Sequence, residues 1–437
     1  MPPHTTIVIG AGMAGLAAAC TLQEAGYDVK ILEGRDRLGG RTYTEHSLGV
    51  SNDLGAAWIH GPLANPMTTF AKRFDVGTAY TDFDNRFGNS TIAFDADGSQ
   101  LDTAQFTTGM RFFNGAYDRL FTSVLYERPS RDVRSMADLY RSGLPGVGEL
   151  SEVERKGFYY GSVVRVQYGD AADLHEIDWR LSNRYVKLPG GDLILPGGGF
   201  GRIVAGLADG LTIETDTVVE SIAYGEDGVR VRTNRGEERA DHVIVTVPLG
   251  VLKAGRIAFF PALPAEKQAA IQRIGYGHYE KLALKFPRCF WPTEPHRLNY
   301  LPGTQPELFT SWVNVAHYSG EPILVAMHAG SRARHINRWP DDKYIAEAMI
   351  VLRKIFGADV PDPVAYVRTE WETDPFALGS YSYSAVGGYP EDRPTLAAPV
   401  AERVHFAGEA THPRYFGTVH GAWETGVRAA REIMSNA

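Results

Sequence analysis

The pattern of apolar residues at the start of the chain predicts a strand, a helix and a second strand. Residues 5–10 (TTIVIG) form an apolar run of strand length that ends in glycine, and the segment MAGLAAACTLQEAG follows with small and apolar residues at helical spacing. The helix is expected to end at Gly26, and DVKILEG then forms a buried strand that ends at Glu33. Residues 5–33 therefore have the plan of a βαβ unit that opens a parallel sheet.

Further along the chain, two kinds of pattern alternate. Residues 80–185 are polar, rich in aromatic side chains and mostly helical in pattern, whereas PGGDLILPGGGFG and the buried strand in ADHVIVTVPLG return to the character of the first segment. Residues 280–385 are rich in strand-like aromatic segments, and the C-terminal segment has the pattern of a strand, a glycine turn, a loop and an amphipathic helix. We therefore predict an α/β fold in which two domains are interleaved.

The composition excludes several classes of protein. The 437 residues carry a formal net charge of −8 and no stretch concentrates like charges, so we expect neither nucleic acid nor an anionic membrane as a partner. A cationic partner suits this balance better. The two cysteines, Cys20 and Cys289, provide neither a disulfide framework nor a CxxC motif. Every apolar run is too short to span a membrane and the first residues lack the features of a secretion signal, so we expect a cytoplasmic protein.

A GxGxxG motif formed by Gly10, Gly12 and Gly15 directly follows the first predicted strand, and Glu33 stands at the end of the next one. This is the complete context of a dinucleotide-binding motif, in which Gly10 permits a tight turn, Gly12 lets the backbone approach a pyrophosphate and Gly15 lets helix and strand pack closely. The helix N-terminus then faces the phosphates, and Glu33 accepts hydrogen bonds from a ribose. The motif alone does not separate NAD from FAD. The cofactor-binding candidates here are Gly10, Ala11, Gly12, Met13, Ala14, Gly15 and Glu33.

The loop that follows Glu33, GRDRLGGRTYT, distinguishes the two cofactors better. Arg41 follows two glycines, and an arginine in such a loop can reach the pyrophosphate from the side opposite the helix. The loop resembles that of the FAD-containing amine oxidase family, whose members carry a similar LGGR after the ribose-binding acid. The resemblance implies FAD as the cofactor, with Arg35, Gly40 and Arg41 among the residues that bind it.

The segment DLGAAWIHGPLANP resembles the same family, and most of all its polyamine oxidase branch. The resemblance implies that His60 comes near the substrate amine. Histidine titrates near neutral pH, so His60 could hold or relay a proton from an incoming ammonium group, but a purely structural, hydrogen-bonded histidine is an equally good interpretation. The residues that the resemblance places beside the isoalloxazine ring are Gly55, Ala56 and Ala57, and Trp58 is a further cofactor-binding candidate.

A lysine on a predicted strand is a further candidate for chemistry. In IGYGHYEKLALKFPRCFW, Lys281 alternates with leucines, where an ammonium group is unfavourable unless a partner or water meets it. The family has a lysine at this place that is hydrogen-bonded through one water to flavin N5. The resemblance implies that Lys281 assists proton transfer and the reaction with oxygen. The alternative is that Lys281 and Lys285 are charges on a solvated face of a sheet.

The segment WETDPFALGSYSY carries the family's spacing of aromatic residues. The resemblance implies that Trp371 packs on the flavin and that Tyr381 forms one wall of an aromatic cage, which attracts cations and excludes water. Ser380 stands where monoamine oxidases have the cysteine that bonds to the flavin, so we expect FAD to be noncovalent. Thr418 stands where those enzymes have the second cage tyrosine. This opens the cage on one side, as in mammalian-type polyamine oxidases and lysine-specific histone demethylases.

The C-terminal segment VHFAGEATHPRYFGTVHGAWETG completes the predicted cofactor site. The resemblance implies that Gly408 and Glu409 lie at the cofactor, with Glu409 next to a ribityl hydroxyl. A helix that begins near Thr418 would present the amide of Val419 to flavin N1 and O2, where a helix N-terminus favours the negative charge that develops on reduction. Val219, in DTVVESI, is similar to the family's adenine-side valine. The alternative is an ordinary amphipathic C-terminal helix.

The resemblance covers nearly the whole chain, from Ile7 to about Arg431, and implies the amine oxidase architecture. A Rossmann-like FAD-binding domain and a mixed α+β substrate-binding domain are interleaved; the first comprises residues 1–80, 190–280 and 390–437, and the second comprises residues 81–189 and 281–389. The implied activity is the oxidation of an amine by hydride transfer to FAD, giving an imine and then an aldehyde, while O2 is reduced to hydrogen peroxide. The catalytic candidates are Lys281, His60, Tyr381 and Thr418; no metal is expected.

Several alternatives stay open. An L-amino-acid oxidase shares the fold but is expected to have an arginine where Trp58 stands. A histone demethylase would need inserted protein-binding elements, for which we see no room between residues 290 and 380. A non-catalytic flavoprotein is a rival of a different class, and a desaturase or isomerase that acts on an apolar substrate is a further one.

The sequence identifies the partners only as a small-molecule amine and O2, and it leaves a monomer and a homodimer equally open. The segment GDAADLHEID carries several acids that could line a vestibule for a polycation, but a solvated loop is the favoured interpretation. These acids are Asp170, Asp173, Glu176 and Asp178.

Overall fold

The strand, helix and second strand predicted at the start of the chain are present. The computed structural model describes residues 5–82, 90–123, 134–141, 146–182, 184–303 and 308–435. The unit consists of β1 (Thr5–Ile9), α1 (Met13–Glu24) and β2 (Asp28–Leu32). The two strands pair in parallel over their whole length. Gly26 has a φ of 83°, which is the left-handed conformation expected just after a helix ends.

This unit belongs to a five-stranded parallel sheet with the order β22, β13, β1, β2, β9. The other strands are β9 (Thr212–Glu214), β13 (His242–Val245) and β22 (Val404–Phe406). The sheet therefore draws its strands from the beginning, the middle and the end of the chain, so the two lobes are interleaved as predicted. The exact domain boundaries stay a prediction.

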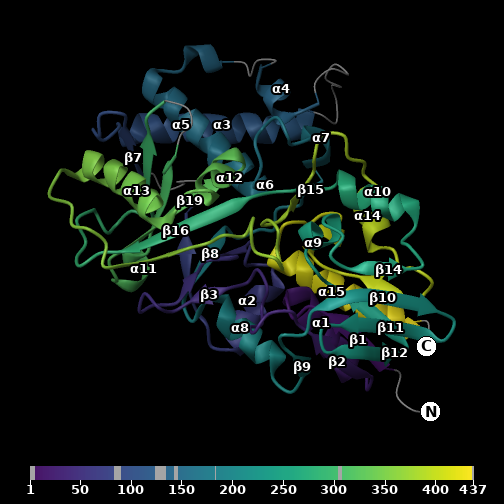
Figure 1. Cartoon of the computed structure of the whole chain (residues 1–437). Coiled ribbons are helices and arrows are strands. Elements are labelled where there is room, and N and C mark those ends of the chain that lie inside the picture. The colour runs from purple at the N-terminus through teal and green to yellow at the C-terminus, as the bar shows by residue number, and fades with distance from the viewer. Residues whose placement is uncertain are drawn as a thin grey trace.

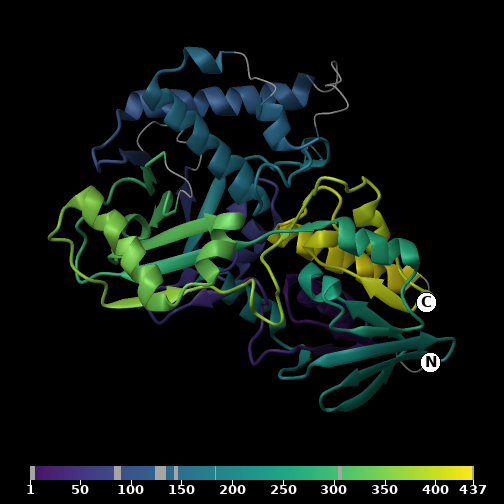
Figure 2. The same cartoon turned by 45° about the horizontal axis from the view of Figure 1, so that its top comes forward.

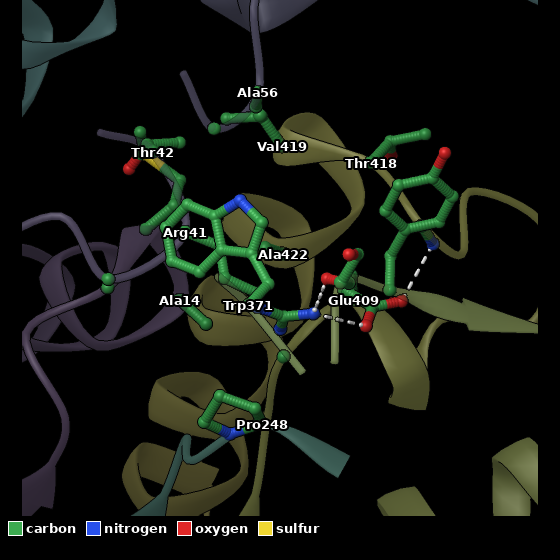
Figure 3. A pocket seen from close by; sticks show the side chains of 18 of the residues that line it. Ala14, Arg41, Thr42, Ala56, Pro248, Trp371, Glu409, Thr418, Val419 and Ala422 are labelled. Atoms are coloured by element: carbon green, nitrogen blue, oxygen red, sulfur yellow. Dashed lines mark hydrogen bonds and ion pairs between the residues drawn. The ribbon is translucent and has the colours of Figure 1, made fainter. Parts of the chain in front are cut away.

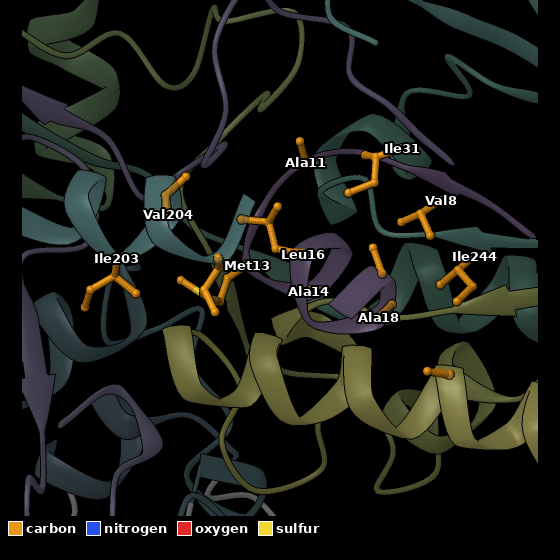
Figure 4. Close-up of a cluster of buried hydrophobic side chains, with 14 of the residues drawn as sticks. Val8, Ala11, Met13, Ala14, Leu16, Ala18, Ile31, Ile203, Val204 and Ile244 are labelled. Carbon is orange, nitrogen blue, oxygen red and sulfur yellow. The ribbon is translucent and has the colours of Figure 1, made fainter. Parts of the chain in front are cut away.

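Alternate residues of the central strand β1 face two different cores. Val8 packs toward α1, whereas Ile7 and Ile9 belong to the core on the opposite face. On the first face, the C-terminal helix packs directly on α1 at Gly426, where a Cβ would lie 2.1 Å from the carbonyl oxygen of Ala14. Figure 4 shows this core. The helices around α1 are α8 (Gly199–Ala208) and α15 (Val419–Ser435).

A second, mostly antiparallel sheet covers the opposite face in the order β12, β11, β10, β14. Its strands are β10 (Val219–Gly225), β11 (Gly228–Thr233), β12 (Gly236–Ala240) and β14 (Ala258–Phe260). Short helices complete this lobe, on the lower right of Figure 1. They are α9 (Leu249–Lys253), α10 (Ala265–Arg273) and α14 (Asp392–Ala397).

The other lobe is built on a six-stranded mixed sheet with the order β20, β16, β19, β18, β17, β7. Its strands are β7 (Thr91–Asp95), β16 (Tyr279–Lys285), β17 (Arg297–Leu301), β18 (Ser311–Asn314), β19 (Ile323–Ala329) and β20 (Ala365–Arg368). The helices associated with it, on the left of Figure 2, are α11 (Ala316–Ser319), α12 (Ser331–Asn337) and α13 (Asp341–Phe356). The strand β7 corrects the mostly helical prediction for its region; it pairs with the distant β17, so the local pattern does not reveal it.

A group of helices lies above this sheet in Figures 1 and 2. The group comprises α3 (Thr103–Ser123), α4 (Met136–Arg141), α5 (Glu152–Ser162), the π-helical segment η2 (Val163–Gln167), α6 (Tyr168–Asp170) and α7 (Trp179–Ser182). The smaller elements are β3 (Thr44–Glu45), β4 (Asn52–Asp53), β5 (Trp58–His60), α2 (Pro66–Arg73), β6 (Gly77–Thr81), β8 (Asp192–Gly197), β15 (Gly275–Tyr276) and β21 (Ser382–Tyr383). None of the described helices has the length and apolar character needed to cross a membrane. The predicted α/β fold class is confirmed.

Candidate active site

Nearly all of the predicted site residues line one cavity of about 910 Å³, to which both lobes contribute. Its wall combines the glycine loop and the start of α1 with residues of β16 and the start of α15. The predicted residues in the wall are Gly10, Gly12, Met13, Ala14, Glu33, Arg35, Gly40, Arg41, Gly55, Ala56, Ala57, Trp58, His60, Val219, Lys281, Trp371, Tyr381, Gly408, Glu409, Thr418 and Val419. Two predicted residues, Ala11 and Gly15, do not line the cavity.

The glycine loop and the first turn of α1 fit the pyrophosphate of a dinucleotide. No side chain caps the N-terminus of α1 and its first turn holds no acid, so its backbone N–H groups suit an anion. A Cβ at Gly12 would meet only the carbonyl oxygen of Gly39, at 3.9 Å, which leaves the backbone open to close approach. A Cβ at Gly15 would lie 1.9 Å from the carbonyl oxygen of Gly10, so only glycine lets the helix pack onto the loop.

The carboxylate of Glu33 holds the glycine loop from behind. It accepts hydrogen bonds from the amide of Ala11 at 2.7 Å and from the amide of Arg35 at 2.9 Å. The guanidinium of Arg35 forms two hydrogen bonds with Asp374, at 2.7 and 2.8 Å, and so ties this loop to the segment that follows β20. The acid therefore sits beside the loop as the motif requires, and its contact with a ribose stays a prediction.

A partly buried ion pair joins two predicted cofactor residues that are far apart in the sequence. Arg41 donates to Glu409 at 3.0 Å and to the carbonyl oxygen of Ser380 at 2.7 Å (Figure 3). Glu409 also accepts from the hydroxyl of Ser382 at 2.6 Å and from the amide of Gly417 at 2.7 Å. Burial by itself would raise the pKa of Glu409, but these donors, Arg41 foremost, hold it below its usual value. The pair fixes the cavity wall where the predicted contacts with pyrophosphate and ribityl chain would form.

Lys281 lies on β16 with only 3% of its surface exposed. Its ammonium group donates to the carbonyl oxygens of Asp53 at 2.9 Å and Gly55 at 2.7 Å, and it lies 5.1 Å from the centre of the Trp58 ring. Solvation on an open sheet face is therefore the wrong interpretation for Lys281, whereas it fits Lys285, which is partly exposed and forms a surface ion pair. Burial lowers the pKa of Lys281 and raises the pKa of the nearby Asp53 carboxyl, so the proton on Lys281 is held weakly.

His60 is both hydrogen-bonded within the fold and accessible from the cavity, so it has features of the structural histidine and of the proton-handling histidine that the sequence left open. Its Nδ1 lies 2.6 Å from Oδ1 of Asp192 on the neighbouring strand β8. Burial would raise the pKa of Asp192, but its bond to His60 lowers it. His60 also lines the cavity, with 43% of its side chain exposed, so this hydrogen-bonded histidine is accessible to a substrate.

The wall around Tyr381 is aromatic. The Tyr381 hydroxyl donates to the carbonyl oxygen of Tyr168, and its ring centre lies 6.2 Å from that of Tyr279. The rings of Tyr279 and Tyr168 are 5.4 Å apart, and Tyr185 and Phe416 form a second pair in the same cavity at 5.7 Å. Such a surface attracts cations and excludes water.

Four of these aromatic residues are not among the site residues predicted from the sequence. Tyr279 had a usable signal, because it stands two residues before Lys281 on one strand and therefore shares its face. The other three come from a helical segment and two loops whose approach to the cavity depends on the tertiary structure. They are Tyr168, Tyr185 and Phe416.

Thr418 directly precedes α15, which agrees with the predicted helix start near this residue. Its hydroxyl donates to the carbonyl oxygen of Tyr415 at 2.6 Å and accepts from the amide of Gly421 at 3.0 Å. The Thr418 hydroxyl therefore forms its hydrogen bonds with the backbone of its own turn. Val419, the first residue of the helix, lines the cavity. The hydroxyl of Ser380 is likewise bonded to the backbone of its neighbourhood.

A family model described as flavin-containing amine oxidoreductase matches residues 13–434. The chain belongs to this family. The match spans both lobes and the cavity between them, so the resemblance noted from the motifs is confirmed, and FAD is the cofactor of this family member.

Curated relatives of this family member include two kinds of amine oxidoreductase. The chain is 36% identical over 99% of its length to lysine-specific histone demethylase 1 homolog 3 of Oryza sativa subsp. japonica, but it covers 54% of that protein. It is 33% identical over 98% of its length to polyamine oxidase 2 of Arabidopsis thaliana and covers 87% of that protein. The chain thus spans about half the length of the demethylase relatives it matches.

The fold has a close counterpart among solved structures. A triple mutant of putrescine oxidase, from a structure-based redesign of cofactor binding, superimposes with a TM-score of 0.81. The comparison covers 100% of this chain and 99% of the other, at 19% sequence identity. It establishes the shared architecture of the two proteins.

Proposed function

We propose that this protein oxidises the C–N bond of a small-molecule amine, a polyamine or a related primary or secondary amine, with O2 as the electron acceptor. The observation that carries the proposal is that one cavity brings Lys281, His60 and Tyr381 together with the dinucleotide loop. An amine bound there meets an aromatic wall, a buried lysine and an accessible histidine. The similarity to polyamine oxidase 2 over nearly all of both chains supports the same substrate class.

The residues of the cavity fit FAD. The first turn of α1 would hold the pyrophosphate, Glu33 a ribose hydroxyl, and the start of α15 the flavin. When bound, FAD would supply the acceptor for a hydride from the carbon next to the amine nitrogen, and O2 with two protons would then take up the electron pair as hydrogen peroxide. Because Ser380 offers no thiol, the proposed binding is noncovalent.

The side chains around the amine control its protonation and the access of water to it. The rings of Tyr381 and Tyr279 exclude water, and an environment of low polarity favours the neutral amine over the ammonium form. His60, held by Asp192, takes the proton that the entering ammonium releases. Lys281 keeps a weakly held proton at Nζ for the reaction with O2. The imine that leaves the cavity hydrolyses in water to an aldehyde and an amine.

The demethylase relatives favour a second candidate, the oxidation of an N-methyl group on a lysine side chain. The identity to these relatives is as high as that to polyamine oxidase 2, and Thr418, in place of a second cage tyrosine, lines the cavity. In the described part of residues 290–380, however, the chain forms β17 to β20 of the six-stranded sheet and α11 to α13. This supports a small molecule rather than a histone tail as the substrate.

A peroxide-coupled screen of the purified yellow protein tests these candidates. The panel contains spermine, spermidine, their acetylated forms, putrescine, aromatic monoamines, amino acids and a peptide with N-methylated lysine. Turnover of polyamines supports the proposal, turnover of the peptide alone supports the second candidate, and turnover of amino acids alone indicates an L-amino-acid oxidase. A protein that binds FAD and releases no peroxide with any of them is a non-catalytic flavoprotein, and the proposal is then wrong.

A further inference from the structure

One acid in the cavity has no partner among the residues that the structure describes. Asp170 ends α6, and its side chain lines the cavity together with Tyr168, Tyr185 and Tyr381. Within the described ranges of the chain, its carboxylate takes part in no hydrogen bond and no ion pair. Asp170 is half-buried. A carboxylate that is partly shielded from water and has no partner is unfavourable, so its place in an aromatic wall needs another explanation.

The backbone that carries Asp170 is held firmly. The Tyr381 hydroxyl donates to the carbonyl oxygen of Tyr168. The backbone amide of His278 donates to the carbonyl oxygen of Ala171 at 2.8 Å. Gly277 approaches so closely that a Cβ there would lie 2.7 Å from the carbonyl oxygen of Asp170. The acid is therefore not a mobile loop residue that happens to face inward.

The local conformation around Asp170 is unusual on both sides. The π-helical segment η2 precedes it, and Ala171 follows with a φ of 52°, in the left-handed region that residues other than glycine rarely adopt. π-helical turns and strained backbone are each unfavourable and concentrate at functional sites. Asp170 has a π-helical segment before it and a left-handed residue after it, and we take this as an indication that the position of the acid serves a ligand.

The nearest compensating charge, Arg393, does not pair with Asp170 in the described part of the chain. Burial raises the pKa of Asp170 to about 7, and Arg393 acts against this shift. The guanidinium of Arg393 donates to the hydroxyl of Ser382 at 2.8 Å and to the carbonyl oxygen of Ala410 at 3.0 Å, and it lies 4.0 Å from the centre of the Phe416 ring. Arg393 thus influences Asp170 from a distance, and a cation from the cavity can still pair with the acid.

We propose that Asp170 binds a second cationic group of the substrate, so that the enzyme selects diamines and longer polyamines over monoamines. This inference rests on the proposed amine oxidation. A dication fits the observed chemistry, because one amine nitrogen is oxidised while another, still an ammonium, meets the carboxylate and the faces of the surrounding tyrosines. The net charge of −8 agrees with a cationic ligand.

The first test compares paired substrates on the FAD-loaded enzyme: 1,4-diaminobutane with butylamine, and 1,8-diaminooctane with octylamine. Asp170→Asn should lower kcat/KM for the diamines about tenfold to a hundredfold and leave the monoamines nearly unchanged, since one charge-assisted contact is lost. Asp170→Glu keeps the charge and should retain the preference for diamines. Asp118→Asn is the matched control, because Asp118 also lines the cavity but pairs with Arg165 at 2.6 Å and is largely exposed.

The second test measures binding without turnover. Calorimetric titration with 1,8-bis(trimethylammonium)octane and with octyltrimethylammonium should show tighter binding of the dication to the wild-type enzyme, and Asp170→Asn should remove the difference. Equal losses for monoamine and diamine, or the same loss in Asp118→Asn, would overturn the inference. If no amine is oxidised at all, the proposed function fails, and the titration still decides whether Asp170 recognises a second positive charge.

Discussion

The ammonium group of Lys281 donates a hydrogen bond of 2.7 Å to the carbonyl oxygen of Gly55, and this contact joins the sheet of one lobe to the segment that leads into β5. It explains how a buried cation is tolerated, because two carbonyl oxygens and the ring of Trp58 replace part of its lost hydration. The segment that holds the lysine also carries the small residues that line the cavity. The position of the lysine and the shape of the predicted flavin site therefore depend on each other.

Replacing Lys281 with methionine should slow the reaction with O2 while FAD stays bound. The substitution keeps most of the side-chain volume and removes the weakly held proton, so we expect the reduced enzyme to react with O2 about a hundredfold more slowly. Rapid mixing of the reduced enzyme with oxygenated buffer, followed by flavin absorbance, measures the rate. Lys285→Met is the control, since Lys285 lies on the same strand and pairs with Glu321 at the surface. Unchanged oxidation in Lys281→Met would remove its assigned role.

Two glycines of the dinucleotide loop should respond differently to alanine. In Gly15→Ala the new Cβ meets the carbonyl oxygen of Gly10, so the free energy of unfolding of the FAD-free protein should fall by more than about 2 kcal/mol. In Gly12→Ala the new Cβ has space, so stability should change by less than about 1 kcal/mol while the affinity for FAD falls at least about tenfold. Denaturant unfolding and fluorescence titration with FAD measure the two effects. Full FAD affinity in Gly12→Ala would place the pyrophosphate elsewhere.

Local sequence patterns were enough to predict the first βαβ unit, because its strands, helix and glycines all lie within residues 5–33. They were not enough for β7, which has only five residues and joins the sheet through β17, a partner distant in the chain. The helices α11, α12 and α13 likewise lie in a region whose aromatic segments predicted strands. Packing between distant segments decides such elements, and a local pattern does not contain it.

The site residues that belong to short motifs were predictable, and those placed by tertiary structure were not. The four acids of GDAADLHEID illustrate the difference, because they look alike in the sequence. Asp173 and Glu176 face Arg334, and Asp178 accepts from backbone amides at the start of α7, so a surface role is right for these three. For Asp170 the favoured solvated loop was wrong, because a π-helical segment and a left-handed alanine turn it into the cavity.

The rate of amine oxidation should rise with pH. A neutral amine is the reactive form, so kcat/KM should increase about tenfold per pH unit until it levels above an apparent pKa that lies on the alkaline side of neutrality. Steady-state kinetics from pH 6 to pH 10 with the best amine of the screen measure this. A profile that is flat over that range would contradict the requirement for a neutral amine.

The free energy of unfolding of the protein should depend on pH through the ionisation of Asp170. Its pKa is about 7 in the folded protein against 3.8 for an ordinary aspartate, so the folded state binds the proton more tightly than the unfolded state. The stabilisation from this proton is complete below about pH 4 and is lost as the pH rises through about 7. Asp170→Asn has no such proton, so its free energy of unfolding relative to wild type should increase between pH 4.5 and 7.5 and then level off. Urea unfolding of both proteins at matched FAD saturation measures the difference. If the difference in free energy of unfolding does not vary with pH, Asp170 is ionised in the folded protein and its charge is already compensated there. The argument that the acid needs a cationic ligand would then fail.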